Sequence, residues 1–224
     1  MKRCKLIFII TLILLGLYSR NTSLKAQIAP NTTIKSLDFS TLKDQIHEGD
    51  IIFQTSLTAQ SKAIQLATHS KYSHCGIIYK NNDSLYVFEA VQTVKSTPLD
   101  EWIVRGKDSS FVVKRLKNAK QVLTNEVILD MKKIGETYQG KKYDYFFEWS
   151  DDKMYCSELV WKIYKQTTGL EIGQLQMLKD FDLTNDEVQK LLKSRFGENI
   201  PLEEKIISPV GIFNSDLLMT VTEK

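Results

Sequence analysis

Apolar residues in the middle of the chain recur with the short period of β-strands. The segment 49-GDIIFQ-54 follows a glycine turn and predicts a short buried strand. The segments 74-HCGIIYK-80 and 85-LYVFEAV-91 are rich in branched and aromatic residues, and the polar turn 81-NNDS-84 joins them. This pattern predicts an antiparallel hairpin. A further strand is predicted at 111-FVVKRL-116.

Elsewhere, apolar residues recur at helical spacing behind residues that can cap a helix. Thr58 precedes a helix predicted over 58–70. Thr124 precedes an amphipathic helix predicted over 124–140, which Gly140 ends. Two more helices are predicted at 155–167 and at 184–197, the second with Thr184 as its cap.

The order of these elements indicates the fold class. Strands and helices are interleaved, but the clearest strand pair is antiparallel, which favours an α+β layer fold over a parallel doubly wound sheet. The last segment predicts one or two strands, at 206–213 and 217–221. Residues 27–45 have the character of a leader with a few apolar contacts. No segment has the composition of a linker, so we expect a single domain over 27–224.

The start of the chain has a different pattern. Basic residues come first, and 6-LIFIITLILLGL-17 is an unbroken apolar run. The run is short for a bilayer span and fits a secretory signal peptide over 1–26, with cleavage near Ala26. An uncleaved membrane anchor is the alternative. A lipoprotein is disfavoured because Cys4 precedes the apolar run. We therefore expect a secreted or periplasmic protein of the cell envelope.

Charge changes the picture once the signal peptide is set aside. The whole chain has 30 Lys and Arg against 27 Asp and Glu, a net charge of +3. The predicted signal peptide holds five of the basic residues and no acidic one, which leaves 25 basic and 27 acidic side chains, net −2. The basic excess belongs to the targeting segment and gives no support to nucleic-acid binding.

The predicted hairpin brings a histidine and a glutamate together. With a two- or four-residue turn, Leu85 pairs with Lys80 and Glu89 pairs with Gly76. His74 and Glu89 then become diagonal neighbours on one face. An unpaired acid in this apolar strand would be costly to bury, so we expect the imidazole as its partner. A three-residue turn would reverse the register and break this pairing.

A helix start supplies the candidate nucleophile. Asp151 and Asp152 are cap candidates for a helix that begins near Tyr155, and Cys156 lies in its first turn. Backbone N–H groups and the helix dipole stabilise a thiolate there and can bind a developing oxyanion. The sequence thus predicts that His74 acts as general base to this thiol and then as general acid to the leaving group.

Several plainer interpretations stay open. Cys75 should point away from His74 because side chains alternate along a strand, so we expect a small buried residue there. Cys156 could be an ordinary core residue, and His74 a hydrogen-bonded core histidine. A Cys75–Cys156 disulfide requires the two residues to face each other. A metal site is not expected, because two distant cysteines and one histidine lack ligand spacing.

The segments that carry this chemistry also carry a family likeness. The order of 61-SKAIQLATHSKYSHCGIIYK-80, 87-VFEAVQTVKSTPLDEW-102 and 154-MYCSELVWKIYK-165 resembles the YiiX-like permuted papain-fold proteins. These are relatives of NlpC-type cysteine peptidases and of the lecithin:retinol acyltransferase group. The segments 178-LKDFDL-183 and 208-SPVGIFNSDLL-218 extend the resemblance over nearly the whole mature chain.

The resemblance implies a fold and a set of roles. The fold is a circularly permuted papain-like one, with an antiparallel sheet packed against helices. Carried over residue by residue, Cys156 corresponds to the nucleophile, His74 to the base and Glu89 to the orienting acid. The backbone N–H of Cys156, with Tyr155 as a second contributor, corresponds to the oxyanion hole. No cofactor is implied.

These inferences predict an exported cysteine hydrolase. We expect it to cleave amide bonds in cell-envelope peptides or N-acyl amides through an acyl-enzyme. The alternatives are a lipid acyl hydrolase or acyltransferase on the same triad, and a binding module without turnover. The stretches 143-YDYFFEW-149 and 170-LEIGQLQML-178 could line an acyl pocket or belong to the core. The expected partner is the substrate, peripheral contact with a membrane stays open, and nucleic acid is not expected.

Overall fold

The described part of the protein is residues 39–224 of a computed structural model, and these form one compact unit. The predicted signal peptide over 1–26 and most of the expected leader lie outside the described residues. Within residues 39–224, no helix combines the length and the apolar character that crossing a membrane requires.

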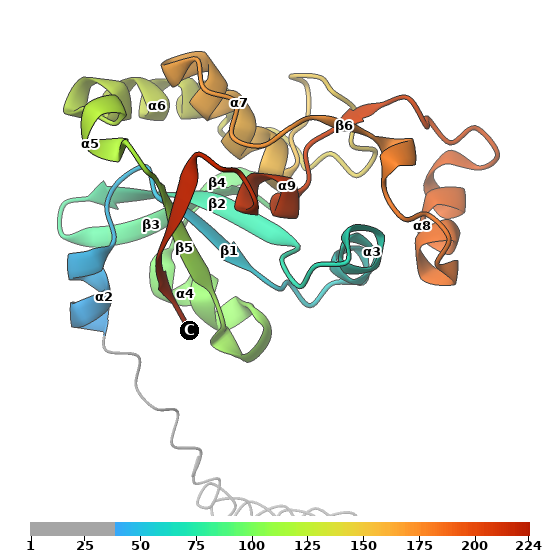
Figure 1. Cartoon of the computed structure of the whole chain (residues 1–224), viewed down its shortest axis with the longest axis horizontal. Helices are drawn as coiled ribbons and strands as arrows, with labels where there is room; N and C mark the ends of the chain where they lie inside the picture. Colours follow the sequence, from blue (N-terminus) through green and yellow to red (C-terminus); the bar gives the residue numbers. More distant parts are fainter. Residues whose placement is uncertain (1–38) are drawn as a thin grey trace, which may run out of the picture. The chain divides into compact units, whose positions relative to one another are not determined.

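An antiparallel sheet of six strands forms the centre of the fold (Figure 1). Its strands lie in the order β4-β3-β2-β1-β5-β8, and each neighbouring pair is antiparallel. This confirms the predicted α+β class. The strands are β1 (Ile51–Gln54), β2 (His74–Asn81), β3 (Ser84–Ala90), β4 (Val94–Pro98), β5 (Val112–Leu116) and β8 (Leu218–Glu223), and a separate pair is β6 (Gln176–Met177) with β7 (Lys205–Ile206).

Helices cover both faces of the sheet. The helices α6 (Asn125–Tyr138) and α7 (Cys156–Thr168) lie over one face, and α4 (Leu99–Arg105) lies on the other (Figure 1). The helices α3 (Ala59–Thr68) and α8 (Asp186–Phe196) pack against each other. The remaining helices are α2 (Phe39–Gln45), α5 (Ala119–Val122) and α9 (Pro209–Phe213), with 3₁₀ turns at Lys107–Ser109 and Leu178–Asp180.

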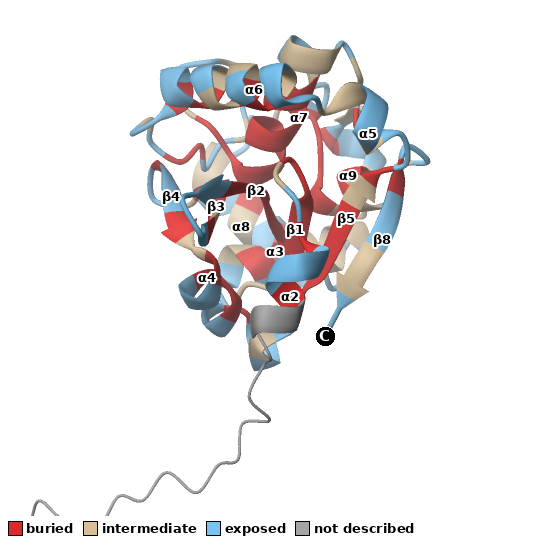
Figure 2. Ribbon diagram, turned by 90° about the vertical axis from the view of Figure 1, so that its left-hand side faces the viewer, coloured by how far each residue is buried: buried red, intermediate tan, exposed pale blue. Residues whose placement is uncertain are grey.

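Alternation along the strands divides the apolar residues between two layers. Ile77 of β2 and Phe88 of β3 join the main core with Leu159 of α7. Ile78 lies on the opposite face of the sheet, where Trp102 of α4 is also fully buried. Figure 2 shows α7 as the most deeply buried helix, with α6 exposing its outer side to solvent. The start of α7 is therefore held firmly against β2.

The central hairpin has the predicted register. Lys80 pairs with Leu85, and the same register continues toward the start of β2, where Gly76 lies opposite Glu89. A methyl group at position 76 would come within 2.5 Å of Val87 Cγ1 and 3.3 Å of Glu89 Cβ. Glycine thus leaves room here for the side chains of the neighbouring strand.

Two of the predicted helix caps are confirmed. The Thr58 side chain accepts a hydrogen bond from the N–H of Ser61 at the start of α3. The Thr124 side chain accepts one from the N–H of Val127 at the start of α6. The cap predicted for α8 is wrong by one residue, because Asn185 caps the helix.

Three other boundaries differ from the sequence analysis. Tyr155 occupies the position before α7, while Asp151 pairs with Lys162 at 2.8 Å instead of capping the helix. The strand predicted over 206–213 is largely wrong, because the Ser208 side chain caps α9 and Pro209 starts it. The sequence analysis also assigned no element to 94–105, which forms β4 and α4.

Candidate active site

His74 and Glu89 make the contact that the hairpin register predicts. The imidazole Nε2 lies 2.5 Å from Glu89 Oε2, and the carboxylate is completely buried. The ring of Trp102 stacks against the imidazole, with 5.9 Å between the ring centroids. His74 is the first residue of β2, where it pairs with Gln54 of β1.

Glu89 has three further partners that the sequence analysis missed. Its Oε1 accepts from Thr97 Oγ1 at 2.7 Å, its Oε2 accepts from Trp102 Nε1 at 2.9 Å, and Arg105 Nη2 contacts both oxygens at 2.7 and 2.6 Å. Burial raises the pKa of Glu89, but the hydrogen bonds and charges of His74 and Arg105 outweigh burial and lower the pKa to about 2. The carboxylate is therefore ionised at neutral pH.

One signal could have revealed part of this network. Glu89 pairs with Lys95 across β3 and β4, so Thr97, two residues further along β4, shares its face. A second hairpin at 94–98 would have placed Thr97 there from sequence. The contacts of Trp102 and Arg105 depend on how α4 folds back against the sheet, which local spacing does not specify.

Cys156 is the first residue of α7, and its thiol is nearly buried. The first N–H groups of a helix have no intrahelical acceptor, so the Cys156 N–H is available to a ligand. Hydrogen bonding from the Cys75 thiol is the main cause that lowers the pKa of Cys156 well below its usual range. Burial opposes this lowering, and the positive charge of His74 adds to it.

The pKa of His74 shifts in the opposite direction, upward. Burial lowers the pKa of His74, but the negative charge of Cys156 and the carboxylate of Glu89 outweigh burial and raise the pKa to about 9. A lowered thiol pKa beside a raised imidazole pKa favours a thiolate–imidazolium pair. The imidazole and the carboxylate are thus in contact, and the charge of Cys156 acts on the same imidazole.

Cys75 differs from its expectation in one respect. It is fully buried, as predicted, but it belongs to the same core cluster as Cys156 and acts on the pKa of that thiol. The reason is that Cys75 belongs to the core under α7, where Cys156 lies, and the charge of Cys156 also acts on His74. The predicted alternation of His74 and Cys75 along the strand was correct, but both side chains still interact with Cys156. Both cysteines are free thiols.

Tyr143 is a site residue that the sequence analysis did not single out. Tyr143 forms a parallel β-bridge with Met154, just before α7. The Tyr143 side chain lines the same pocket as Cys156. Gln60 Nε2 donates a hydrogen bond to the Tyr143 hydroxyl oxygen at 2.8 Å. Burial and the charge of Cys156 raise the pKa of Tyr143 well above its usual value, so the phenol keeps its proton.

Tyr155, the second predicted oxyanion contributor, is engaged elsewhere. Its N–H donates to Glu158 Oε2 at 3.3 Å, and its hydroxyl oxygen accepts from the N–H of Ile207 at 3.2 Å. The ring packs edge-on against Phe147 with 5.2 Å between centroids. These contacts fix the residue that precedes Cys156 and so hold the start of α7.

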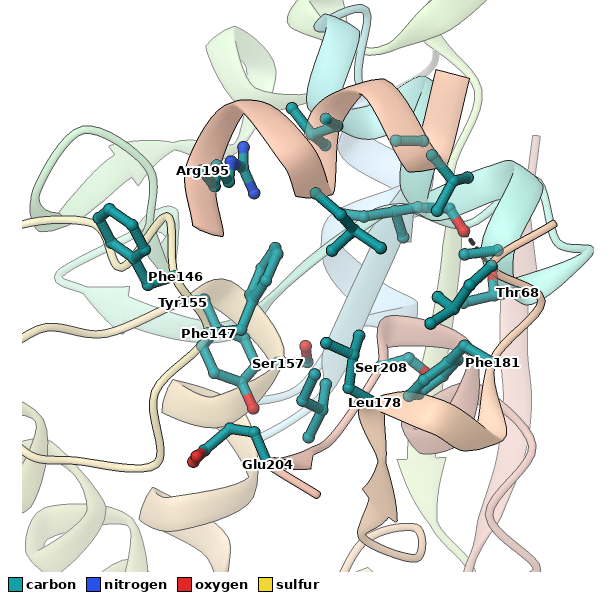
Figure 3. Close-up of a pocket in the computed structure, with 18 of the residues that line it drawn as sticks. Thr68, Phe146, Phe147, Tyr155, Ser157, Leu178, Phe181, Arg195, Glu204 and Ser208 are labelled. Carbon is teal, nitrogen blue, oxygen red and sulfur yellow. Dashed lines mark hydrogen bonds between the residues drawn. The ribbon is translucent and has the colours of Figure 1, made fainter. Parts of the chain in front are cut away.

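An apolar pocket, drawn in Figure 3, has Cys156 among its lining residues. Its cavity volume is about 90 Å³, and it continues into space that is open to solvent. Cys156 and Tyr155 belong to its lining, and aliphatic and aromatic side chains form most of the rest. These walls come from α3, from the segment before α7, from residues 178–183 and from α8, and include Ala63, Ile64, Ala67, Phe146, Phe147, Leu178, Phe181, Leu183, Val188, Leu191, Leu192 and Phe196.

Comparison with known proteins identifies the family. The model of the permuted papain-like amidase enzymes, the YaeF/YiiX or C92 family, matches residues 45–222. The chain belongs to the permuted papain-like amidase family. It is therefore an enzyme of the hydrolase class with cysteine hydrolase-type chemistry, and the family and the antiparallel sheet together confirm the predicted permuted papain-like fold.

Individual family members are similar over most of the chain. The uncharacterized protein YiiX of Escherichia coli strain K12 is 48% identical over 180 residues, which cover 80% of this chain and 88% of that protein. A crystal structure of YiiX from Escherichia coli O157:H7 is 49% identical, with a TM-score of 0.77 over 80% of this chain and 98% of that one. The family resemblance seen in the sequence is confirmed.

The E. coli O157:H7 family member is described as a metalloprotein. In residues 39–224 of the present chain, no three His, Cys, Asp or Glu side chains gather in a cluster that could hold a metal ion. Glu89 is already occupied by its donors, and the guanidinium of Arg105 beside it would repel a cation. The side chains of this site do not fit a resident metal.

Proposed function

We propose that this protein is a thiol amidase that removes a long apolar acyl group from an N-acyl amide. The observation that carries the proposal is the apolar pocket, which has Cys156 in its lining and is otherwise lined almost entirely by aliphatic and aromatic groups. Such a pocket favours an alkyl chain over the polar peptides of the cell wall. The family's amide chemistry favours an amide bond at the sulfur.

The proposed reaction starts from the thiolate–imidazolium pair. The Cys156 thiolate attacks the amide carbonyl, and the oxyanion that forms accepts hydrogen bonds from the Cys156 N–H and the Tyr143 hydroxyl. His74 then donates its proton to the leaving amine as the carbon–nitrogen bond breaks, which leaves a thioester. Water attacks the thioester, His74 accepts its proton, and the fatty acid leaves.

Glu89 supports these proton transfers without gaining or losing a proton itself. Its low pKa keeps it ionised throughout, so it favours the protonated imidazole and holds the ring toward Cys156. Arg105 balances the buried negative charge that would otherwise be costly. The proposed triad is therefore Cys156, His74 and Glu89.

Trapping the acyl-enzyme tests the proposal. The mature protein would be mixed with dodecanoyl amides and esters and with cell-wall peptides, quenched in acid and analysed by mass spectrometry. A fatty acyl adduct on Cys156, absent in Cys156→Ala, together with release of the amine from the amide, is the expected result. A peptidyl adduct on Cys156 would show that the substrate is a peptide and not an N-acyl amide. Turnover of esters alone would indicate a lipid acyl hydrolase.

Alkylation of the thiol tests the triad independently of substrate. The rate of Cys156 modification by iodoacetamide should stay high well below pH 8.5, the ordinary cysteine pKa being about 8.5. In His74→Ala the titration should move toward that ordinary value. An ordinary titration in the wild type would refute the thiolate–imidazolium pair.

We also propose that the protein is exported to the cell envelope. The basic start followed by the apolar run 6-LIFIITLILLGL-17 supports a signal peptide. Expressed in a bacterial host, the protein should be found in the periplasm or medium, and N-terminal sequencing should begin after Ala26. Retention in the membrane at full length would favour the uncleaved anchor.

A further inference from the structure

A chain of side chains connects the wall of the apolar pocket to the active site. Arg195 Nη2 donates to Gln60 Oε1 at 2.6 Å, and Gln60 Nε2 donates to the Tyr143 hydroxyl oxygen at 2.8 Å. Arg195 belongs to α8 and Gln60 to the first turn of α3, so the contact joins two helices that form pocket walls. None of these contacts is local in sequence.

Arg195 is held in place by more than this hydrogen bond. Its guanidinium carbon lies 5.8 Å from the centroid of the Tyr145 ring and 5.5 Å from that of Phe147. Figure 3 shows Arg195 near the end of α8, on the same side of the pocket as Phe146 and Phe147. A guanidinium that stacks between aromatic rings has few other positions for its donors.

The chemistry of arginine decides which way the glutamine amide faces. Guanidinium groups only donate hydrogen bonds, so the Gln60 oxygen must face Arg195 and its NH₂ group must face Tyr143. The Tyr143 oxygen is then an acceptor toward Gln60. Its own O–H proton is left for a different acceptor, and Tyr143 lines the same pocket as Cys156, whose charge acts on the phenol.

We propose that Gln60 is a positioning residue, oriented by Arg195, that keeps the Tyr143 proton directed to the oxyanion of the tetrahedral intermediate. The inference rests on the proposed thiol amidase function. A glutamine with the reverse orientation would accept the Tyr143 proton and remove it from the reaction. Arg195 and Gln60 therefore act through Tyr143 and need not touch the substrate.

The decisive variant is Gln60→Glu. A carboxylate has nearly the same shape and still accepts from Arg195, but it cannot donate, so the Tyr143 hydroxyl must donate to it. Loss of one oxyanion donor lowers kcat by roughly 100-fold or more. We expect that loss of kcat on dodecanoyl aminomethylcoumarin amide, with KM changed by less than about threefold. Gln189→Glu, which adds the same charge on the exposed side of α8, should behave like the wild type.

A double-mutant cycle separates this role from a structural one. Tyr143→Phe should lose kcat to a similar extent, and Gln60→Glu should add little to the loss in the Tyr143→Phe background. Arg195→Lys, which retains a donor for the glutamine oxygen, should recover part of the activity that Arg195→Met loses. Thermal unfolding of each variant checks that the fold is intact.

Alkylation of Cys156 distinguishes failure of this inference from failure of the proposed function. Displacement of iodide from iodoacetamide forms no oxyanion, so Gln60→Glu should leave the alkylation rate unchanged while kcat falls. Full kcat in Gln60→Glu, or losses that add independently in the double variant, would overturn the positioning role alone. A wild-type enzyme without Cys156-dependent amide cleavage would overturn the proposed function itself.

Discussion

The imidazole of His74 and the carboxylate of Glu89 meet at 2.5 Å across a β-hairpin, inside a ring of further donors to the carboxylate. Glu89 is completely buried, yet its pKa is lowered to about 2 because positive groups face it on two sides. The carboxylate thereby holds a protonated imidazole against the thiol, and its removal should affect both catalysis and stability.

Glu89→Gln should strongly reduce turnover. The neutral amide no longer stabilises the imidazolium, so the pKa of His74 should fall and the proportion of thiolate should fall with it. We expect kcat to drop roughly 100-fold, within the usual contribution of general acid–base catalysis. Steady-state kinetics on the dodecanoyl amide would measure it, with Thr97→Val as a control that removes only a neutral donor to the same carboxylate. A similar loss in both variants would contradict the charge argument.

The pKa of Glu89 predicts how the free energy of unfolding depends on pH. The folded-state pKa of Glu89, about 2, lies below the ordinary value of 4.5. Its contribution to folding is therefore complete above pH 4.5 and is lost as the pH falls toward 2, and amounts to about 3 kcal/mol. Urea unfolding should show a free energy that falls more steeply over this range in the wild type than in Glu89→Gln. Glu136→Gln, an exposed change on α6, should keep the wild-type slope.

The contact between the two cysteines makes a separate prediction. The Cys75 thiol is the main cause of the low pKa of Cys156, so Cys75→Ala should raise that pKa. Cys75→Ser keeps an O–H donor and should retain most of the effect. We expect kcat/KM to fall about tenfold in the alanine variant, the typical effect of one hydrogen bond to a charged group. The pH dependence of iodoacetamide modification measures the thiol directly, and equal curves for all three proteins would rule out this role for Cys75.

Narrowing the pocket should alter acyl-chain preference. Ala67 lines the pocket from α3, and Ala67→Phe would fill space that an acyl chain needs. We expect kcat/KM for a dodecanoyl amide to fall about tenfold, while an acetyl amide changes by less than about twofold. Ala59→Phe, on the exposed start of the same helix, is the matched control. Equal losses for long and short chains would indicate that the pocket does not hold the acyl group.

Several parts of this arrangement could be predicted from the sequence because they are local. The turn and the alternation of β2 and β3 set the register that makes His74 and Glu89 neighbours. Thr58 and Thr124 mark helix starts because a cap acts within one turn. The position of Cys156 at the beginning of α7 could likewise be predicted from helical spacing.

Other parts depend on how distant elements pack, and local patterns do not encode them. Arg105 reaches Glu89 only because α4 folds back against the sheet, and Cys75 shares a core with Cys156 only because α7 packs against β2. The prediction of a strand over 206–213 was largely wrong for a local reason. Ser208 caps a helix and Pro209 starts it, and this signal outweighed the apolar pattern.

The sequence by itself therefore determined the fold class, the central hairpin and the residue types of the proposed triad, because periodicity and capping act between residues a few positions apart. The tertiary structure decided the protonation of those residues, the apolar pocket beside the sulfur and the contact of Arg195 with Gln60. Those properties come from burial and from charges on separate elements, which exist only once the helices have packed against the sheet.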